Sequence, residues 1–280
     1  MDKSQKKYLM ARQEASVHAP PYWENGAGFF GKKYMEGDDS IEGFLSTPQT
    51  LSARTIREVK GIVYLLSLSP GASVLDCPCG YGRHSVGLAN KEFQVLGSDI
   101  NEEMLTAAHL NADGVPNVRF VRENMLELSY RQGFDAVINM FLAFGFFDDD
   151  KDNARVLTNF LEALKPGGQF LLHSDVNTAR IALGKYKFRE IRHLRSGRSL
   201  EIVESFDRET KRLHGQWVLV DSAGAREELP PYSCRVYTAE EITELCGSVG
   251  FASVQFYGGW NGEELAEDSE ELIVVARKSK

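Results

Sequence analysis

The stretch SVLDCPCGYGRHSVGLA, residues 73–89, places a carboxylate and two glycines where a short apolar run gives way to a helix-like pattern. Asp76 stands at the carboxyl end of the expected strand, and Gly80 and Gly82 open the helix. In an open α/β sheet, ligands bind just beyond the carboxyl ends of the strands. Glycines there permit positive φ angles and let a ligand approach the backbone. The stretch therefore predicts a ligand-binding turn.

Two classes of ligand use such a turn. A dinucleotide would set its pyrophosphate on the helix N-terminus and favour G-x-G-x-x-G with no anion nearby. Here Ser85 stands at the third glycine position, and Asp76 would repel a phosphate. A ligand with a cationic end suits Asp76 better, and S-adenosylmethionine carries both an ammonium and a sulfonium. The plainer alternative is that Asp76 only caps the helix.

Two further strand ends carry polar side chains. Asp99 ends the second expected strand, where a carboxylate can accept hydrogen bonds from both hydroxyls of a ribose. Asn124 follows the third strand, where an amide can meet the amino group of an adenine. With the KPGG sequence at 165–168, these residues make the chain resemble the class I S-adenosylmethionine-dependent methyltransferases, and among them the small-molecule enzymes. The resemblance covers residues 52–175 and, by pattern, 238–277.

The resemblance implies S-adenosyl-L-methionine as the cofactor and a transfer reaction onto a small metabolite. The family's turn usually reads D-x-G-C-G-x-G, whereas this chain has DCPCGYG, with Pro78 in place of the first glycine. We assign cofactor contacts to the strand ends and to the aromatic N-terminal segment. These residues are Tyr22, Tyr34, Asp76, Cys77, Gly80, Gly82, Asp99, Ile100, Asn124, Met125, Asn139 and Met140.

Methyl transfer mainly requires alignment of the acceptor, and a base is needed only if the acceptor arrives protonated. His173 and Asp175 alternate along the fifth expected strand, so both could face the acceptor, and a histidine base suits neutral pH. A structural histidine is the equal alternative. Aromatic residues could enclose the acceptor or simply pack the protein. The substrate-binding candidates are Trp23, Phe144, Trp217, Tyr232, Arg235, Tyr237 and Trp260.

The elements that position these residues follow from periodicity. Strand and helix patterns alternate from residue 73 to Asp175, which predicts a doubly wound α/β fold with a mostly parallel seven-stranded sheet. A preceding helix at 52–66 is expected to bury Ile56 and Val59 on one stripe. The expected units are an arm or lid at 1–50, a cofactor-binding core at 51–178, an antiparallel β insert capping the active site at 179–237, and a final helix with two core strands at 238–280.

Composition narrows the function. The chain of 280 residues has a net charge of -8 and contains neither a membrane-length apolar run nor an N-terminal signal pattern. Its four cysteines indicate no zinc site and no disulfide framework, so we expect no bound metal and a cytoplasmic protein. We further expect a monomer or a homodimer. Residues 180–212 hold ten Lys or Arg against five Asp or Glu, which leaves an RNA methyltransferase as an alternative. A cofactor-binding protein without turnover is another.

Overall fold

A computed structural model describes residue 23, residues 28–41 and residues 49–280. Tyr22, one of the expected cofactor contacts, lies outside these ranges. The elements of the α/β core are α3 (Leu51–Leu65), β1 (Ser73–Asp76), α4 (Arg83–Ala89), β2 (Gln94–Asp99), α5 (Glu102–Asn111), β3 (Val118–Arg122), the 3-10 helix η1 (Met125–Glu127), β4 (Phe134–Asn139), α6 (Asp150–Ala163), β5 (Leu164–Ser174), α8 (Ala239–Val249), β11 (Ser253–Tyr257) and β12 (Leu272–Arg277).

The core sheet has seven strands in the order β11-β12-β5-β4-β1-β2-β3. β1 to β5 run parallel, and β12 lies antiparallel to both β5 and β11. This confirms the doubly wound, mostly parallel sheet. Chain order reverses at β1, which pairs with β2 on one side and β4 on the other, so the carboxyl ends of β1 and β4 flank the switch point where ligands bind.

Local sequence sets several helix ends. The α8 helix begins with a capping box, in which Thr238 and Glu241 each satisfy the other's backbone N–H, and it ends at Gly250 in the left-handed conformation. The Thr-x-x-Glu spacing at 238–241 and the glycine at 250 are the sequence signatures of these two helix ends. The stripe expected on α3 was wrong at Ile56, which is 65% exposed. The buried face of α3 instead carries Arg54 and Glu58.

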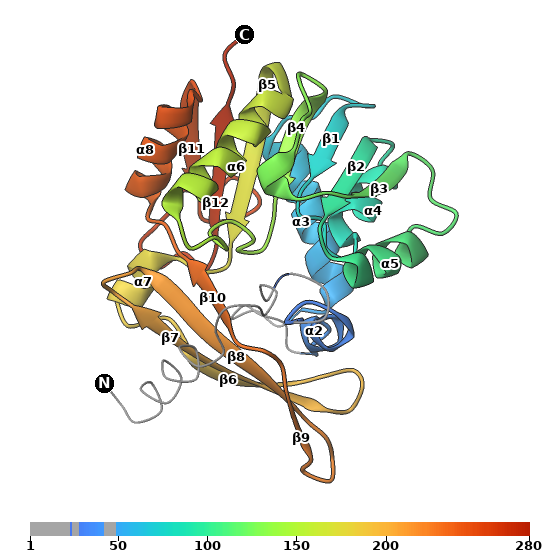
Figure 1. The fold of residues 1–280 in the computed structure, drawn as a ribbon, viewed down its shortest axis with the longest axis vertical. Coiled ribbons are helices and arrows are strands. Elements are labelled where there is room, and N and C mark those ends of the chain that lie inside the picture. Colours follow the sequence, from blue (N-terminus) through green and yellow to red (C-terminus); the bar gives the residue numbers. More distant parts are fainter. Residues whose placement is uncertain (1–22, 24–27, 42–48) are drawn as a thin grey trace.

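A second sheet is inserted between β5 and α8. After α7 (Thr178–Ala182), its strands are β6 (Arg189–His193), β7 (Ser199–Asp207), β8 (Arg212–Val220), β9 (Arg226–Glu228) and β10 (Tyr232–Arg235), all paired antiparallel. In Figure 1 this insert sheet lies below the carboxyl edge of the core sheet. The short helix α2 (Lys32–Asp38) sits between them.

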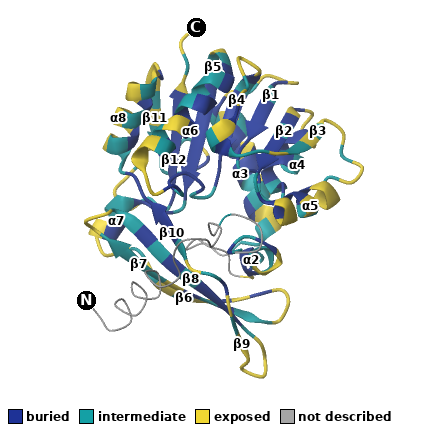
Figure 2. Cartoon of the chain, in the orientation of Figure 1, coloured by how far each residue is buried: buried dark blue, intermediate teal, exposed yellow. Residues whose placement is uncertain are grey.

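Burial follows this layering. The central strands of the core sheet are buried, as the dark blue strands in Figure 2 show. The insert has a smaller apolar cluster of its own, which includes Phe29 from the chain before α2 together with Leu200 and Trp217 of the insert. The insert is therefore packed partly on the N-terminal segment. Among the described residues no helix is both long enough and apolar enough to cross a bilayer.

Candidate active site

The glycine turn after β1 forms one wall of a cavity at the carboxyl edge of the core sheet, here called the turn cavity. It holds about 880 Å³, open mouth included. The ends of β2 and β3, the loop after β4 and α2 supply the other walls. Its lining residues are Trp23, Phe30, Tyr34, Asp38, Cys77, Pro78, Cys79, Gly80, Tyr81, Arg83, His84, Asp99, Ile100, Asn101, Met104, Glu123, Asn124, Met125, Met140, Phe141, Ala143, Phe146 and Phe147.

Asp99 links the turn to the end of β2. Its Oδ2 accepts a hydrogen bond from the Gly80 backbone N–H at 2.8 Å, and its Oδ1 accepts one from the Asn101 N–H at 2.9 Å. Only 7% of Asp99 is exposed, and burial raises its pKa to about 6. Gly80 and Gly82 have φ angles of 54° and 78°, a region that favours glycine. The Asp99 carboxylate therefore lines the cavity and also holds the backbone of the glycine turn in place.

Asp76 lies beneath the same turn and does not line the cavity. Its Oδ2 accepts a hydrogen bond from the Ser85 hydroxyl at 2.6 Å. Its Oδ1 has no hydrogen-bond partner within the described part of the chain, and burial raises the pKa of Asp76 to about 7. The structure therefore does not give Asp76 the direct ligand contact expected from the sequence, because the side chain points into the core. Gly82 also stands behind the cavity wall, where an added Cβ would lie 2.9 Å from Phe120.

The end of β3 contributes Asn124 and Met125. The Asn124 side-chain oxygen caps η1 by accepting a hydrogen bond from the Leu126 N–H at 3.0 Å, so its amide nitrogen is the group left for a ligand. Asn139 at the end of β4 does not line the cavity, because its amide nitrogen donates to the Cys77 carbonyl at 2.9 Å. Of the other expected cofactor residues, those that line the turn cavity are Tyr34, Cys77, Ile100 and Met140.

A buried charge network borders the turn cavity. Asp38 at the end of α2 accepts hydrogen bonds from Arg54 at 2.7 Å and from the Tyr81 hydroxyl at 2.5 Å. Arg83 pairs with Glu58, and the Arg54 guanidinium lies 4.4 Å from the centre of the Phe141 ring. Burial opposes ionisation of Asp38, but Arg54 and Arg83 hold its pKa below the usual value. The sequence analysis assigned no role to these groups.

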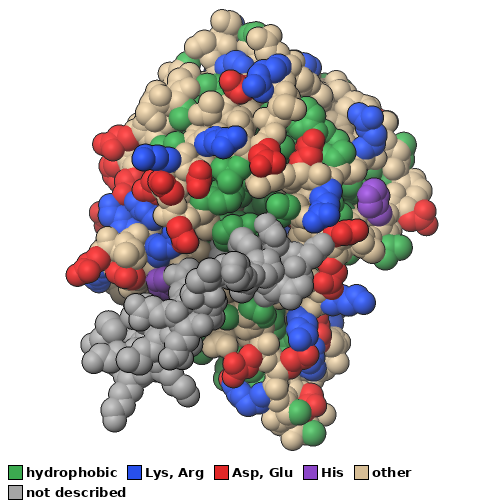
Figure 3. Space-filling model, viewed as in Figure 1, with side chains coloured by type: hydrophobic (Ala, Val, Ile, Leu, Met, Phe, Trp, Pro, Cys, Tyr) green, Lys and Arg blue, Asp and Glu red, His purple; other side chains and the backbone are tan. Residues whose placement is uncertain are grey.

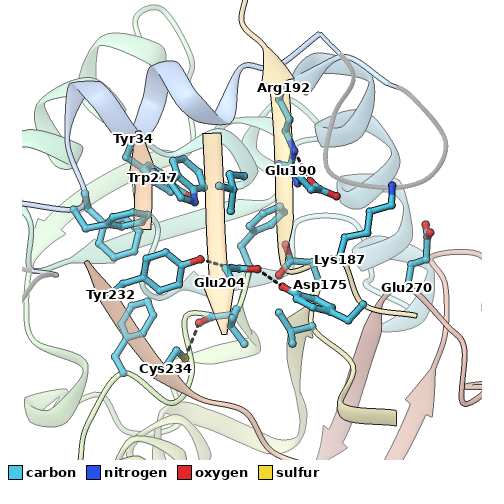
Figure 4. A pocket seen from close by; sticks show the side chains of 18 of the residues that line it. Tyr34, Asp175, Lys187, Glu190, Arg192, Glu204, Trp217, Tyr232, Cys234 and Glu270 are labelled. Carbon is cyan, nitrogen blue, oxygen red and sulfur yellow. Dashed lines mark hydrogen bonds and ion pairs between the residues drawn. The ribbon is translucent and has the colours of Figure 1, made fainter. Parts of the chain in front are cut away.

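A second cavity, of about 1100 Å³, opens between the core and the insert sheet, and is here called the insert cavity. Figure 4 shows its aromatic and charged side chains. It shares Phe30, Tyr34, Phe141 and Phe146 with the turn cavity. The remaining lining residues are Phe29, Leu142, Asp175, Val176, Arg180, Tyr186, Lys187, Glu190, Arg192, Ile202, Glu204, Trp217, Tyr232, Cys234 and Glu270. The two cavities therefore meet at a common aromatic wall.

Residues 74–168 match the family model described as a methyltransferase domain. The Bacillus subtilis protein YqeM, named as a methyltransferase, is 26% identical over 221 residues, which are 76% of this chain and 87% of that protein. The chain is an S-adenosylmethionine-dependent methyltransferase.

Two further proteins resemble this chain. The solved structure of the CcbJ methyltransferase from Streptomyces caelestis has a TM-score of 0.71 and 20% identity over 88% of this chain and 98% of that one, so it shares the Rossmann-like fold. A Streptomyces venezuelae protein, named dTDP-3-amino-3,4,6-trideoxy-alpha-D-glucopyranose N,N-dimethyltransferase, is 28% identical over 97 residues, or 35% of this chain and 40% of that protein.

In this methyltransferase, only one of the two expected catalytic residues lines a cavity. Asp175 lines the insert cavity, but His173 lines neither cavity and is fully buried. The expectation that both face one side assumed a strand running through both residues. β5 ends at Ser174, so Asp175 lies on the following bend and leaves the alternation.

His173 instead supports the wall between the cavities. Its Nδ1 accepts a hydrogen bond from the Phe141 N–H at 3.3 Å, and its carbonyl accepts one from the Leu142 N–H at 3.0 Å. Phe141 and Leu142 have φ angles of 63° and 53°, which non-glycine residues rarely adopt. Strained backbone of this kind persists where surrounding contacts hold it. His173 is therefore placed as a positioning residue, with its Nε2 3.4 Å from Glu271.

Three of the seven residues expected to bind the acceptor line a cavity, and four do not. Trp217 and Tyr232 line the insert cavity, whereas Trp23 lines the turn cavity. The other four line neither cavity, because each packs or finds a polar partner elsewhere. Phe144 contacts the Tyr237 ring, the Tyr237 hydroxyl donates to Asp150, Arg235 pairs with Glu241, and Trp260 donates to Glu271.

Several residues of the insert cavity and of the buried charge network were not predicted from the sequence. Glu204 and Tyr186 lie in the insert, where alternation does not tell which face is covered. Arg54 and Glu58 carried a usable signal: they are spaced i, i+4 on the side of α3 that also buries Val59 and Ile62. Charges on the apolar face of a helix indicate a buried polar site.

Proposed function

We propose that the enzyme methylates a nitrogen or oxygen atom of a small-molecule acceptor, with the cofactor in the turn cavity and the acceptor in the insert cavity. The observation that carries the proposal is that Phe30, Tyr34, Phe141 and Phe146 line both cavities, so that the two ligands would lie next to each other. S-adenosylmethionine supplies a methyl group on a positively charged sulfur. The protein's own task is then to align the acceptor and exclude water.

The residues of the turn cavity fit this cofactor. Asp99 keeps lone pairs on both carboxylate oxygens for ribose hydroxyls, since each oxygen accepts one backbone hydrogen bond. The free amide nitrogen of Asn124 would donate to an adenine ring nitrogen, rather than accept from the adenine amino group. The buried Asp76, with its orphaned Oδ1, would favour a cationic ligand end through its charge rather than by direct contact.

The insert fits a small acceptor better than RNA. Most of the basic residues in 180–212 pair with acids, several of which come from other segments, as in the pairs Arg198–Glu36, Arg195–Asp39 and Lys185–Asp268. On the face shown in Figure 3, acidic and basic side chains are interspersed. RNA binding needs a continuous basic surface that releases counterions. The relative from Streptomyces venezuelae is named for a sugar nucleotide, which is a small molecule.

The cofactor assignment predicts that Asp99→Ala weakens binding of the demethylated product, S-adenosylhomocysteine, at least about tenfold, which corresponds to a charge-assisted hydrogen bond of about 1.5 kcal/mol. Isothermal titration calorimetry measures the affinity, and circular dichroism checks the fold. Asp113→Ala is the matched control, since Asp113 is exposed and does not line the turn cavity. Wild-type affinity in a folded Asp99→Ala variant would refute the assignment.

A further inference from the structure

The insert cavity is lined by four acids (Asp175, Glu190, Glu204 and Glu270) and three bases (Arg180, Lys187 and Arg192), so its acids exceed its bases by one. Glu270 pairs with Arg180 at 3.3 Å, and Glu190 pairs with Arg192. Asp175 is different. No other described residue donates a hydrogen bond to its carboxylate or forms an ion pair with it. Burial raises the pKa of Asp175, and the charges of His173, Arg54 and Arg192 only partly offset that rise.

Glu204 is the second unneutralised acid of this cavity. The hydroxyls of Tyr186 and Tyr232 donate to its two oxygens, the first at 2.7 Å, as the dashed lines in Figure 4 show. Hydroxyl donors stabilise a carboxylate but bring no positive charge. Burial raises the pKa of Glu204 to about 7, the tyrosines oppose the rise, and the charge of Asp175 adds to it. The two carboxylates therefore repel each other within one cavity.

Aromatic rings complete the surroundings. Trp217 stacks on Tyr34, with ring centroids 5.3 Å apart and an interplanar angle of 14°, and Phe29 packs edge-on against Trp217. Ring faces attract cations, and the attraction is stronger in a site that excludes water. Two acids that form no ion pair with a described base, in an aromatic cavity whose acids outnumber its bases by one, favour a positively charged occupant.

We infer that the acceptor is an amine that enters the insert cavity as its ammonium ion, and that Asp175 takes the proton which frees the nitrogen for methylation. This inference rests on the proposed function, because it names the substrate class of the same site. An alcohol would leave the repulsion between Asp175 and Glu204 uncompensated. An ammonium ion relieves it.

The chemistry balances with groups already named. The ammonium R–NH₃⁺ gives one proton to the Asp175 carboxylate and becomes R–NH₂. The nitrogen lone pair then forms the N–C bond to the methyl group as the C–S bond breaks, and the electron pair of that bond stays on sulfur. The product R–NH₂–CH₃⁺ carries the positive charge that the sulfur loses. Glu204 stays in place as the second counter-charge.

The experiment measures binding first and transfer second. Matched probes are benzylamine with benzyl alcohol and cyclohexylamine with cyclohexanol, titrated into the complex of the enzyme with S-adenosylhomocysteine at pH 7.5. We expect each amine to bind at least tenfold more tightly than its alcohol. Asp175→Asn should remove most of that preference without changing alcohol affinity. Equal affinity within each pair, or a preference that survives in Asp175→Asn, overturns the inference.

Two variants guard this test. Glu201→Gln is the control. Glu201 lies on β7, as Glu204 does, but it pairs with Arg226 and does not line the insert cavity. It should keep the amine preference. If Asp175→Asn does not fold, Glu204→Gln carries the same expectation.

Transfer of a deuterated methyl group separates the inference from the proposed function. N-methylated probe, identified by mass spectrometry, supports both. O-methylated alcohol without N-methylated amine overturns the amine inference and leaves the methyltransferase proposal standing. Amine-selective binding with no methylated product from either probe class supports the inference about the cavity and counts against the proposed assignment of acceptor and cofactor sites.

Discussion

Four carboxyl groups around the two cavities have raised pKa values: Asp76 at about 7, Asp99 at about 6, Glu204 at about 7, and Asp175. Burial is the first cause in each case, because the charged form loses its hydration. A protein that keeps such groups ionised at neutral pH gives up stability at these positions. Ligands that bring positive charge or hydrogen-bond donors recover it.

Asp76 allows this cost to be measured. Its folded pKa of about 7 lies above the usual 3.8. The contribution of protonated Asp76 to folding stability is therefore fully present below pH 3.8 and is lost as pH rises through 7. Asp76→Asn should therefore stabilise the ligand-free protein at pH 8, by about 3 kcal/mol relative to its effect at pH 4.5. Urea unfolding at the two pH values measures the difference. Asp113→Asn, an exposed control, should show none, and a gain for Asp76→Asn independent of pH would contradict the assignment.

At the scale of elements, α2 connects the parts that form the site. Asp38 bonds to Arg54 of α3 and to Tyr81 of the glycine turn, while Glu36 pairs with Arg198 next to β7 of the insert. Gly37 packs so closely on Trp217 that an added Cβ would lie 2.8 Å from its ring. This short helix therefore carries contacts from the cofactor side to the acceptor side.

Neighbouring acids at the end of α2 test its anchoring. Asp38 and Arg54 are each 2% exposed at their side chains, so Asp38→Ala leaves a buried guanidinium short of its partner and should lower the free energy of unfolding by about 3 kcal/mol. Asp39 pairs with Arg195 at a half-exposed position, so Asp39→Ala should cost less than about 1 kcal/mol. Chemical denaturation compares the two. Similar losses would mean that the buried pair does not anchor α2.

At the scale of the whole molecule, the cavities lie between two sheets that are joined through few segments. The residues Phe30, Tyr34 and Asp38, in and just before α2, line the turn cavity, and the first two also line the insert cavity. A ligand in the turn cavity would thus contact the element that closes both. We propose that residues 28–41 are the described part of the expected lid.

Hydrogen exchange tests this closure. S-adenosylhomocysteine should slow amide exchange in α2 at least about fivefold, because local opening would then have to break ligand contacts as well. The β9 strand, which lies at the edge of the insert and lines neither cavity, is the internal control and should not change. Mass spectrometry of proteolytic fragments resolves both segments. Unchanged exchange in α2 on saturation with this ligand would show that it is a fixed strap.

The sequence alone determined the features that depend on local patterns. Alternating strand and helix periods predict the doubly wound sheet, and Thr238, Glu241 and Gly250 mark the ends of α8. The glycine turn and the acid that ends β2 lie at the carboxyl edge because parallel strands bring those ends together. Such features need only neighbouring residues or the strand direction.

The tertiary structure decided which side chains face the cavities. Asp76 points under its turn, and His173 packs behind Phe141 although Asp175, two residues on, reaches the insert cavity. Glu204 becomes a cavity residue only because Tyr186 and Tyr232, from other segments, surround it. Pattern tells which residues alternate, but not where a strand ends or which face another layer covers, because contacts between distant segments settle both.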